Sequence, residues 1–303
     1  MSRRSAFIAV IGAPNAGKST LVNRLVGAKV SIVTRKVQTT RARIRGVAIE
    51  GDAQLVFIDT PGIFAPRRRL DRSMVAAAWE GIEDVDFILL VVDAQSMLAG
   101  PSKSTEDTDR ILDELKRRGA KAILVLNKID RLARPKLLKL IAELSVHDVF
   151  ENTFLVSAEN GDGVADLKGY IVGKAPAGEW MYPEDQLSDI SDRLMAAEVT
   201  REKVFTRLHQ ELPYQSTVET TAWTRTGKGE LRIEQTIFVS RESHRPIVLG
   251  KGGQTLKAIG EASRKELSEI FGEPVHLFLN VTVREGWADE AARYREMGLD
   301  IVD

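Results

Sequence analysis

The fold of this chain is decided by the stretch Gly12-Ala13-Pro14-Asn15-Ala16-Gly17-Lys18-Ser19. Apolar residues 7–11 precede it, and Thr20 and an amphipathic run over 21–25 follow it. A strand, a G-x-x-x-x-G-K-S loop and a helix in this order are typical of a phosphate-binding loop. The glycines let backbone N–H groups turn toward an anion, and the helix N-terminus adds its positive dipole end. We therefore expect residues 12–20 to bind the phosphates of a nucleoside triphosphate.

Side chains after the glycines have predicted roles in holding the triphosphate and a metal ion. Lys18 can reach the β- and γ-phosphates, and the Ser19 hydroxyl can ligate Mg²⁺. Further along, a predicted strand over 54–58 ends in Asp59-Thr60-Pro61-Gly62. We expect Asp59 to hold Mg²⁺ through water and the Gly62 N–H to meet the γ-phosphate.

A threonine is expected to complete the magnesium site. Two candidates lie in the polar sequence Gln38-Thr39-Thr40-Arg41. In related nucleotide-binding proteins a threonine directly before an arginine closes over Mg²⁺ when the triphosphate is bound, so Thr40 is the expected ligand. The other interpretation of this pair is a strand edge, because threonine favours β-structure. We expect Thr39, Thr40 and residues 59–63 to act as switches that respond to the γ-phosphate.

The sequence Asn127-Lys128-Ile129-Asp130 predicts that the base is guanine. It follows a predicted buried strand over 123–126. The Asp130 carboxylate only accepts hydrogen bonds, and it can take both the N1–H and the amino group of guanine. Adenine has neither donor at these places, and a buried carboxylate left unpaired is costly. Asn127 is expected to brace the base and its loop, and the aliphatic stem of Lys128 to lie over the ring.

A second loop is expected to contact the same base. Ser157-Ala158-Glu159 follows a predicted strand over 153–156, and the N–H of Ala158 is placed to donate to guanine O6, which adenine lacks. By itself N-K-x-D is also compatible with a surface turn. Its position between a phosphate loop and S-A-E favours the guanine site.

Two residues bear on hydrolysis. In Ras-like proteins a glutamine after the D-x-x-G glycine orients the attacking water, but Ile63 has no polar group, which predicts slow intrinsic turnover. Asn15 resembles the asparagine that helps hold a potassium ion in related GTPases, where an arginine finger would place its charge. The alternative is that Asn15 only tolerates a turn conformation. The expected ligands are therefore GTP or GDP and Mg²⁺, with K⁺ as a further candidate.

Composition agrees with a cytoplasmic protein of two domains. The chain has 303 residues, 43% of them apolar, and no cysteine, which excludes disulfides and thiolate catalysis. Its 43 basic and 43 acidic residues cancel, so global charge does not indicate a nucleic-acid partner. Basic residues are frequent at positions 35–45, and the first acidic residue of the chain is Glu50. This basic segment is either a solvated surface or a site for an anionic partner. The longest apolar run, 87–92, is too short to span a bilayer.

The pattern of the first half predicts a mostly parallel α/β sheet wrapped by helices. Strands are expected near 6–11, 44–50, 54–58, 86–92, 121–126 and 153–156, and helices near 18–27, 71–80, 105–118, 135–146 and 164–173. The pair 44–50 and 54–58 lacks a helix between its members and is expected to form an antiparallel hairpin. We predict a G domain over 1–175, a linker over 176–187 and a second domain over 188–303.

The second half predicts a smaller α+β domain in the order α-β-β-α-α-β. A long amphipathic helix is expected over 188–211, strands over 215–224, 231–240 and 275–284, and a helix over 254–271. Between two helices lies Gly250-Lys251-Gly252-Gly253, the G-x-x-G loop of a type II KH module, which clamps the backbone of single-stranded RNA. Lys251 supplies charge, and Lys257 follows on the helix. A bare G-x-x-G is also compatible with a helix cap; the flanking apolar residues and strands favour RNA binding, and the extra glycine predicts a looser loop.

Together the motifs G-x-P-N-x-G-K-S, Q-T-T-R, D-T-P-G, N-K-x-D and S-A-E and the KH module resemble the bacterial Era GTPase family. The resemblance spans the chain and extends to residues 195–203, 274–277 and 286–289. It implies hydrolysis of GTP to GDP and phosphate, binding of the 3′ end of small-subunit ribosomal RNA by the KH domain, and a role in assembly of the 30S subunit, whose immature form is the implied partner. It also implies peripheral attachment to the inner membrane, which no lipid-anchor motif supports independently. We expect a monomer.

Two other classes of protein would explain only part of the sequence. A nucleotide switch that acts on proteins or membranes would need residues 1–175 but not 246–285. A pure RNA-binding module would leave the first half unexplained. Another ribosome or transfer-RNA GTPase of the same lineage would carry a second G domain or a helical modification domain, and the sequence patterns show neither.

Overall fold

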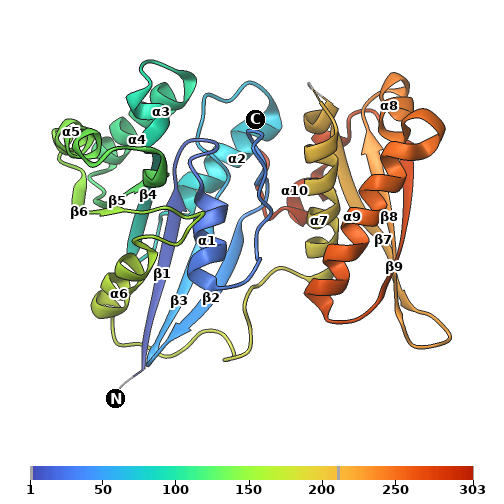
Figure 1. Cartoon of the computed structure of the whole chain (residues 1–303), viewed down its shortest axis with the longest axis horizontal. Coiled ribbons are helices and arrows are strands. Elements are labelled where there is room, and N and C mark those ends of the chain that lie inside the picture. Colours follow the sequence, from blue (N-terminus) through green and yellow to red (C-terminus); the bar gives the residue numbers. More distant parts are fainter. Residues whose placement is uncertain (1–2, 210–211, 303) are drawn as a thin grey trace. The chain divides into compact units, whose positions relative to one another are not determined.

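A six-stranded sheet carries the phosphate-loop sequence in the computed structural model of the chain, which describes residues 3–209 and 212–302 (Figure 1). Its strand order is β2(Ile44–Glu50), β3(Ala53–Asp59), β1(Arg4–Ile11), β4(Phe87–Asp93), β5(Ala122–Asn127), β6(Phe150–Leu155). β2 runs antiparallel to β3, and all other neighbours are parallel. The expected hairpin and the expected parallel sheet are both confirmed.

Helices pack on both faces of this sheet because its parallel strands are apolar on both sides. On β1, Ile8 and Val10 join one core cluster with α1(Lys18–Val26) and α6(Val164–Lys174), while Ala9 and Ile11 join the other. The second cluster contains residues of α2(Arg69–Glu80), α4(Lys103–Arg118) and α5(Arg134–Ser145). The alternation along β1 thus divides the helices between the two faces.

The carboxyl ends of the parallel strands bring the predicted motifs to one edge of the sheet. β1 leads into the phosphate loop, β3 ends at Asp59, and β5 ends at Asn127. One element at this edge, the short helix α3(Ala94–Leu98), was not expected from the sequence. It starts directly after β4 because the Asp93 carboxylate accepts hydrogen bonds from the first N–H groups of the helix.

The second compact unit contains a three-stranded sheet packed against helices. Its strands are β7(Ser216–Arg225), β8(Leu231–Val239) and β9(Val275–Val283), in that order, with β7–β8 antiparallel and β8–β9 parallel. Its main helices are α7(Asp192–Arg207), α8(Arg245–Leu249) and α9(Gln254–Phe271), and a short α10(Ala291–Glu296) follows β9. The expected element order is confirmed.

The first helix of this unit is shorter than the sequence predicts. α7 begins after Ser191, whose side chain accepts from the Leu194 N–H, and it ends where Leu208 becomes extended. Positions 210 and 211 of the expected helix lie outside the described residues. Met195 and Val199 of this helix are buried. Among the described residues, no helix is both long and apolar enough to cross a bilayer.

Two short segments pack with the unit that is distant from them in the sequence: residues 34–39 with the second unit, and the residues from 294 onward with the first. Of the described residues, the first unit contains those in 3–33, 40–189 and 294–302, and the second those in 34–39, 190–209 and 212–293. In the first unit, Tyr294 and Leu299 pack with Met74 of α2. Each compact unit therefore includes a short segment from outside its main range of the sequence.

The segment predicted to be a linker is attached to the first unit. The Gln54 side chain of β3 accepts hydrogen bonds from the N–H groups of Met181 and Tyr182, at 2.8 and 3.0 Å, and donates to the Tyr182 carbonyl at 2.8 Å. The Trp180 indole N–H donates to the Asp52 carbonyl at 3.2 Å. Residues 180–182 thus lie against β3 and the turn before it.

Within the second unit, residues 34–39 are held by α7. Arg201 is 2% exposed and donates to the Thr39 carbonyl at 2.6 Å. Lys36 donates to the carbonyls of Phe205 and Leu208 at the end of the same helix, and burial lowers the pKa of its ammonium group. Part of the basic stretch that the sequence offers as a solvated surface is thereby bound to backbone carbonyls.

Candidate functional site

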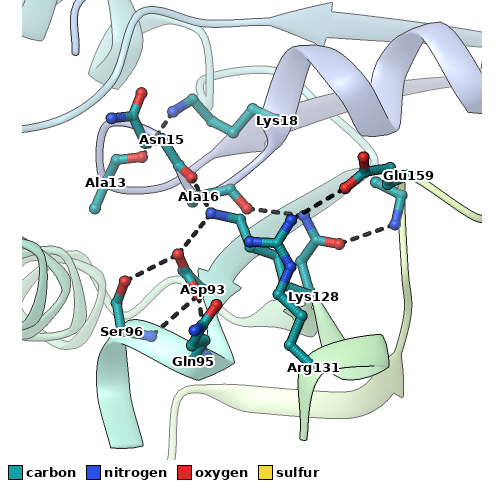
Figure 2. A network of polar contacts seen from close by, with 12 residues as sticks. Ala13, Asn15, Ala16, Lys18, Asp93, Gln95, Ser96, Lys128, Arg131 and Glu159 are labelled. Carbon is teal, nitrogen blue, oxygen red and sulfur yellow. Dashed lines mark hydrogen bonds and ion pairs between the residues drawn. The ribbon is translucent and has the colours of Figure 1, made fainter. Parts of the chain in front are cut away.

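Side chains from two different loops hold the carbonyl groups of the phosphate loop. Lys18 Nζ donates to the Gly12 and Ala13 carbonyls, at 3.0 Å each. Lys128 Nζ donates to the Asn15 carbonyl, and Asn127 Nδ2 to the Ala16 carbonyl, both at 2.8 Å (Figure 2). A carbonyl facing a phosphate would repel it. Because side-chain donors engage these carbonyls, the loop can turn its N–H groups toward an anion.

Glycine is required at two positions of this loop for steric reasons. Gly12 has φ +151°, and a Cβ there would lie 2.3 Å from the Val91 carbonyl oxygen. Gly17 has φ +100°, and its Cβ would lie 2.1 Å from Asn127 Nδ2. Because these two glycines have no side chain, β4 and the Asn127 side chain at the end of β5 can lie close to the loop.

The three predicted magnesium ligands meet beside Lys18. Ser19 Oγ donates to Asp59 Oδ2 at 2.7 Å and lies 2.8 Å from Thr40 Oγ1. The other oxygen of Asp59, Oδ1, is buried and has no hydrogen-bond partner among the described residues. Oxygen donors of this kind fit Mg²⁺, which prefers carboxylate, hydroxyl and phosphate oxygens.

Burial shapes the electrostatics of this cluster. It raises the pKa of the Asp59 carboxyl, although the hydrogen bond from Ser19 and the charge of Lys18 oppose the shift. It lowers the pKa of the Lys18 ammonium to about 8, and Asp59 opposes that shift in turn. The charged forms of Asp59 and Lys18 therefore need partners of opposite charge. A metal ion would supply such a partner to Asp59, and a triphosphate to Lys18.

The two threonines that the sequence offered as alternatives have separate places in the structure. Thr40 reaches Ser19, whereas the Thr39 hydroxyl donates to the Lys36 carbonyl at 2.7 Å, within the segment that belongs to the second unit. This geometry favours Thr40 over Thr39 as the metal ligand.

The residues after Asp59 pack against the phosphate loop and the core. The Thr60 hydroxyl donates to the Val10 carbonyl of β1 at 2.8 Å, and the Ile63 N–H donates to the Gly12 carbonyl at 3.1 Å. The Ile63 side chain is 4% exposed and belongs to a core cluster. A Cβ on Gly62 would lie 3.0 Å from Pro14 Cα. Ile63 thus has a packing role at the position where Ras-like proteins carry a glutamine.

Beside α1 lies a cavity of about 410 Å³, within the usual range for a small-molecule site. The predicted residues Thr20, Ala158 and Glu159 line it. So do residues that the sequence analysis did not single out: Asn23, Arg24, Gly27, Ala28, Lys29 and Val33. Asn23 shapes this wall, because its side chain accepts from the Val30 and Ser31 N–H groups at 2.9 Å each and donates to the Ser31 carbonyl at 2.8 Å.

The two predicted guanine loops are bonded to one another. The Ala158 N–H, which was expected to face guanine O6, donates to Asn127 Oδ1 at 3.0 Å. The buried Ser157 hydroxyl accepts from the Asn160 N–H at 3.3 Å. Glu159 pairs with Arg131 at 3.2 Å, and Arg131 also lies 3.6 Å from Asp130. Asn127 therefore joins S-A-E to the phosphate loop, a role that the motif alone does not reveal.

A further residue at this edge, Asp93, was missed by the sequence analysis. It ends β4 and pairs with Lys128 at 2.6 Å. A carboxylate directly after a buried strand of a parallel sheet was the available signal, since such positions meet at one edge.

The glycine loop of the second unit lies between α8 and α9. Gly250, Gly252 and Gly253 have φ of +73°, +59° and +77°, so three of its four residues adopt conformations that favour glycine. A Cβ on Gly250 would lie 2.2 Å from Thr255 Oγ1, whereas Gly252 and Gly253 have open space. Lys251 and Lys257 are exposed. Gly252, the extra glycine of the loop, thus adopts a left-handed conformation at an exposed position.

Fold and site together define a P-loop nucleotide-binding protein with a second, glycine-loop unit. Residues 7–128 match the family of 50S ribosome-binding GTPases, and residues 211–288 match KH domains. The chain is 57% identical over 297 residues to GTPase Era of Rhizobium meliloti (strain 1021), covering 98% of this chain and 93% of that protein. It is equally 57% identical to GTPase Era of Brucella suis biovar 1 (strain 1330), covering 98% and 94%.

Two solved structures are similar along the whole chain. One is Era in complex with MgGDPNP and nucleotides 1506–1542 of 16S ribosomal RNA, with 36% identity and a TM-score of 0.89 over 98% of this chain and 99% of that one. The other is a variant of Aquifex aeolicus Era bound to GDP and AlF4⁻, with 36% identity and a TM-score of 0.90 over 97% and 99%. The chain belongs to the Era family of GTPases.

The steric requirement at Gly12 can be tested against a glycine that has room. Gly12→Ala is expected to lower kcat/KM for GTP by roughly a hundredfold, because the methyl group must displace the loop from Val91 and a shift of about 1 Å costs that much in a positioned site. Gly51→Ala is the control, with φ +61° and open space around its Cβ. Both variants are measured by phosphate release; equal rates would contradict the steric argument.

Proposed function

We propose that this GTPase is a switch that binds the 3′ end of small-subunit ribosomal RNA through its KH domain and assists maturation of the 30S subunit. The observation that carries the proposal is the match, over both units, to Era in complex with MgGDPNP and nucleotides 1506–1542 of 16S ribosomal RNA. The glycine loop, with an exposed lysine and two glycines in open space, supports contact with an RNA backbone.

The phosphate loop and the cluster beside it are proposed to hold the triphosphate and Mg²⁺. The N–H groups of residues 12–20 would face the phosphates, and Lys18 would move from the loop carbonyls to the β- and γ-phosphates. Ser19, Thr40 and Asp59 would hold Mg²⁺, which neutralises charge on the phosphates when bound. Gly62 would place its N–H near the γ-phosphate, and Thr39, Thr40 and residues 59–63 would respond to that group.

The cavity beside α1 is proposed to take guanosine. Asp130 would pair with the guanine N1–H and amino group, and Lys128 would cover the ring with its stem. Asn127 would hold the base site in place through its hydrogen bonds to the phosphate loop and to Ala158. The Ala158 N–H would meet guanine O6 by sharing its hydrogen with Asn127, and Ser157 and Glu159 would shape the rim.

Other expectations remain predictions. They are the domain boundaries at 175 and 188, binding of the immature 30S subunit, a monomeric state, and a cytoplasmic location with peripheral attachment to the inner membrane. Sedimentation of the purified protein, alone and with vesicles of anionic lipid, tests the last two.

Base specificity is tested at Asp130. Asp130→Asn exchanges an acceptor for an amide donor, so GTP affinity is expected to fall by about a hundredfold or more, while binding of xanthosine triphosphate improves. Asp109→Asn on the exposed face of α4 is the control and should change neither affinity. Titration with fluorescent nucleotides provides the measurement. Equal affinity of the parent protein for GTP and ATP would exclude the proposed base site.

Potassium dependence is tested at Asn15, which has φ +62°. If its side chain helps hold K⁺, the parent should hydrolyse GTP faster in K⁺ than in Na⁺. Asn15→Gly keeps the left-handed turn and removes the side-chain oxygen, so this difference should disappear. A turn role alone predicts the same ratio of rates in both proteins, as measured by phosphate release in the two salts.

RNA contact is tested in the glycine loop. Replacing Lys251 and Gly252 with Asp should lower affinity for a 16S 3′-end fragment at least about tenfold and reduce the slope of log affinity against log salt by roughly 0.7 for each lost phosphate contact. The matched control replaces Lys228 and Gly227 with Asp in the β7–β8 turn, which changes the charge equally in the same unit. If the loop variant is folded, hydrolyses GTP and binds the RNA fragment as tightly as the parent protein, the RNA site does not include this loop.

A further inference from the structure

Asp93 ends β4 with an almost fully satisfied carboxylate whose side chain is 10% exposed. Oδ1 accepts from the N–H groups of Gln95 and Ser96, at 3.0 and 3.1 Å. Oδ2 accepts from the Ser96 hydroxyl at 2.9 Å and from Lys128 Nζ at 2.6 Å (Figure 2). One oxygen therefore caps α3, and the other forms an ion pair with the lysine of N-K-x-D.

Lys128 extends this contact to the phosphate loop. Its ammonium also donates to the Asn15 carbonyl at 2.8 Å, so it bridges the end of β4 and the loop (Figure 2). The bridging residue and its partner in the loop are both in the left-handed region, with φ +66° at Lys128 and +62° at Asn15. Non-glycine residues in this region are strained and persist only where their surroundings hold them. The bridge is such a restraint.

The ammonium of Lys128 needs the carboxylate to keep its place. A lysine side chain has four rotatable bonds and loses considerable entropy when it is fixed. Burial opposes ionisation of Asp93, but hydrogen bonds from Lys128 and Ser96 outweigh it and lower the pKa of the carboxyl. The charged pair thus fixes the end of a side chain whose stem is proposed to cover the guanine ring.

We propose that Asp93 is a positioning residue for GTP binding and hydrolysis, which acts through Lys128 on the Asn15 backbone and on the placement of the guanine ring. The Asp93 carboxylate is engaged by Gln95, Ser96 and Lys128, so its effect on the nucleotide is indirect. The inference rests on the proposed nucleotide site, because it assigns Asp93 an effect on the residues of that site. It joins two parts of the site that the sequence separates, the phosphate loop and the guanine loop.

The competing explanation is that Asp93 only caps α3. Asp93→Asn separates the two roles, because the amide oxygen can still cap the helix while the ion pair with Lys128 is lost. Ser96→Ala is the matched control, since it removes a neutral contact to the same Oδ2 and leaves the ion pair intact.

The experiment measures release of a fluorescent GDP from the full chain and the rate of GTP hydrolysis. Asp93→Asn is expected to release GDP roughly ten times faster, because a charge-assisted hydrogen bond is lost. Ser96→Ala should stay within about twofold of the parent. In a Lys128→Met background the effect of Asp93→Asn should largely disappear, because the two residues act as one unit.

Two outcomes would overturn the proposal. One is a rate of GDP release in Asp93→Asn that stays within about twofold of the parent, as Ser96→Ala should, because capping alone survives in the amide. The other is full additivity of Asp93→Asn and Lys128→Met, which shows that Asp93 does not act through the lysine. A failure of the proposed function is distinguishable from both, because the parent itself would then lack tight GDP binding.

Discussion

The hydrogen bond from Asn127 Nδ2 to the Ala16 carbonyl joins the end of β5 to the phosphate loop, and most of the candidate site depends on it. The Asn127 side chain lies so close to Gly17 that a methyl group on this glycine would be 2.1 Å from the amide nitrogen. The same side chain accepts from the Ala158 N–H. One buried amide thus holds three loops that are far apart in the sequence, and its two polar atoms are both used, as burial of an amide requires.

The lysines complete this arrangement with charge. Lys18 and Lys128 engage loop carbonyls on opposite sides of the motif, and each has a carboxylate partner, Asp59 through its charge and Asp93 through an ion pair. Ammonium groups in a nearly dry site are costly unless an opposite charge is close. The phosphate loop is therefore stabilised by a set of paired charges, and a triphosphate can replace the loop carbonyls as partners of Lys18.

The sheet explains why these groups meet. Parallel strands place their carboxyl ends at one edge, where β1 leads into the phosphate loop and β3, β4 and β5 each end in a polar residue. Gly250 in the second unit follows a different constraint, since its backbone lies so close to Thr255 that no side chain fits. In both units, glycine marks a close approach of backbone to a neighbour.

The sequence by itself determined the strand–loop–helix, the antiparallel pair β2–β3, the order of elements in the second unit and the family, because hydrophobic period and motif spacing are local properties. Only the tertiary structure decided that Thr40 meets Ser19, that Ala158 donates to Asn127, and that Asp93 pairs with Lys128. It also decided that residues 34–39 and 294–303 belong to units distant in the sequence. These features depend on which side chains share one edge or one core, and such contacts between distant residues leave no local pattern in the chain.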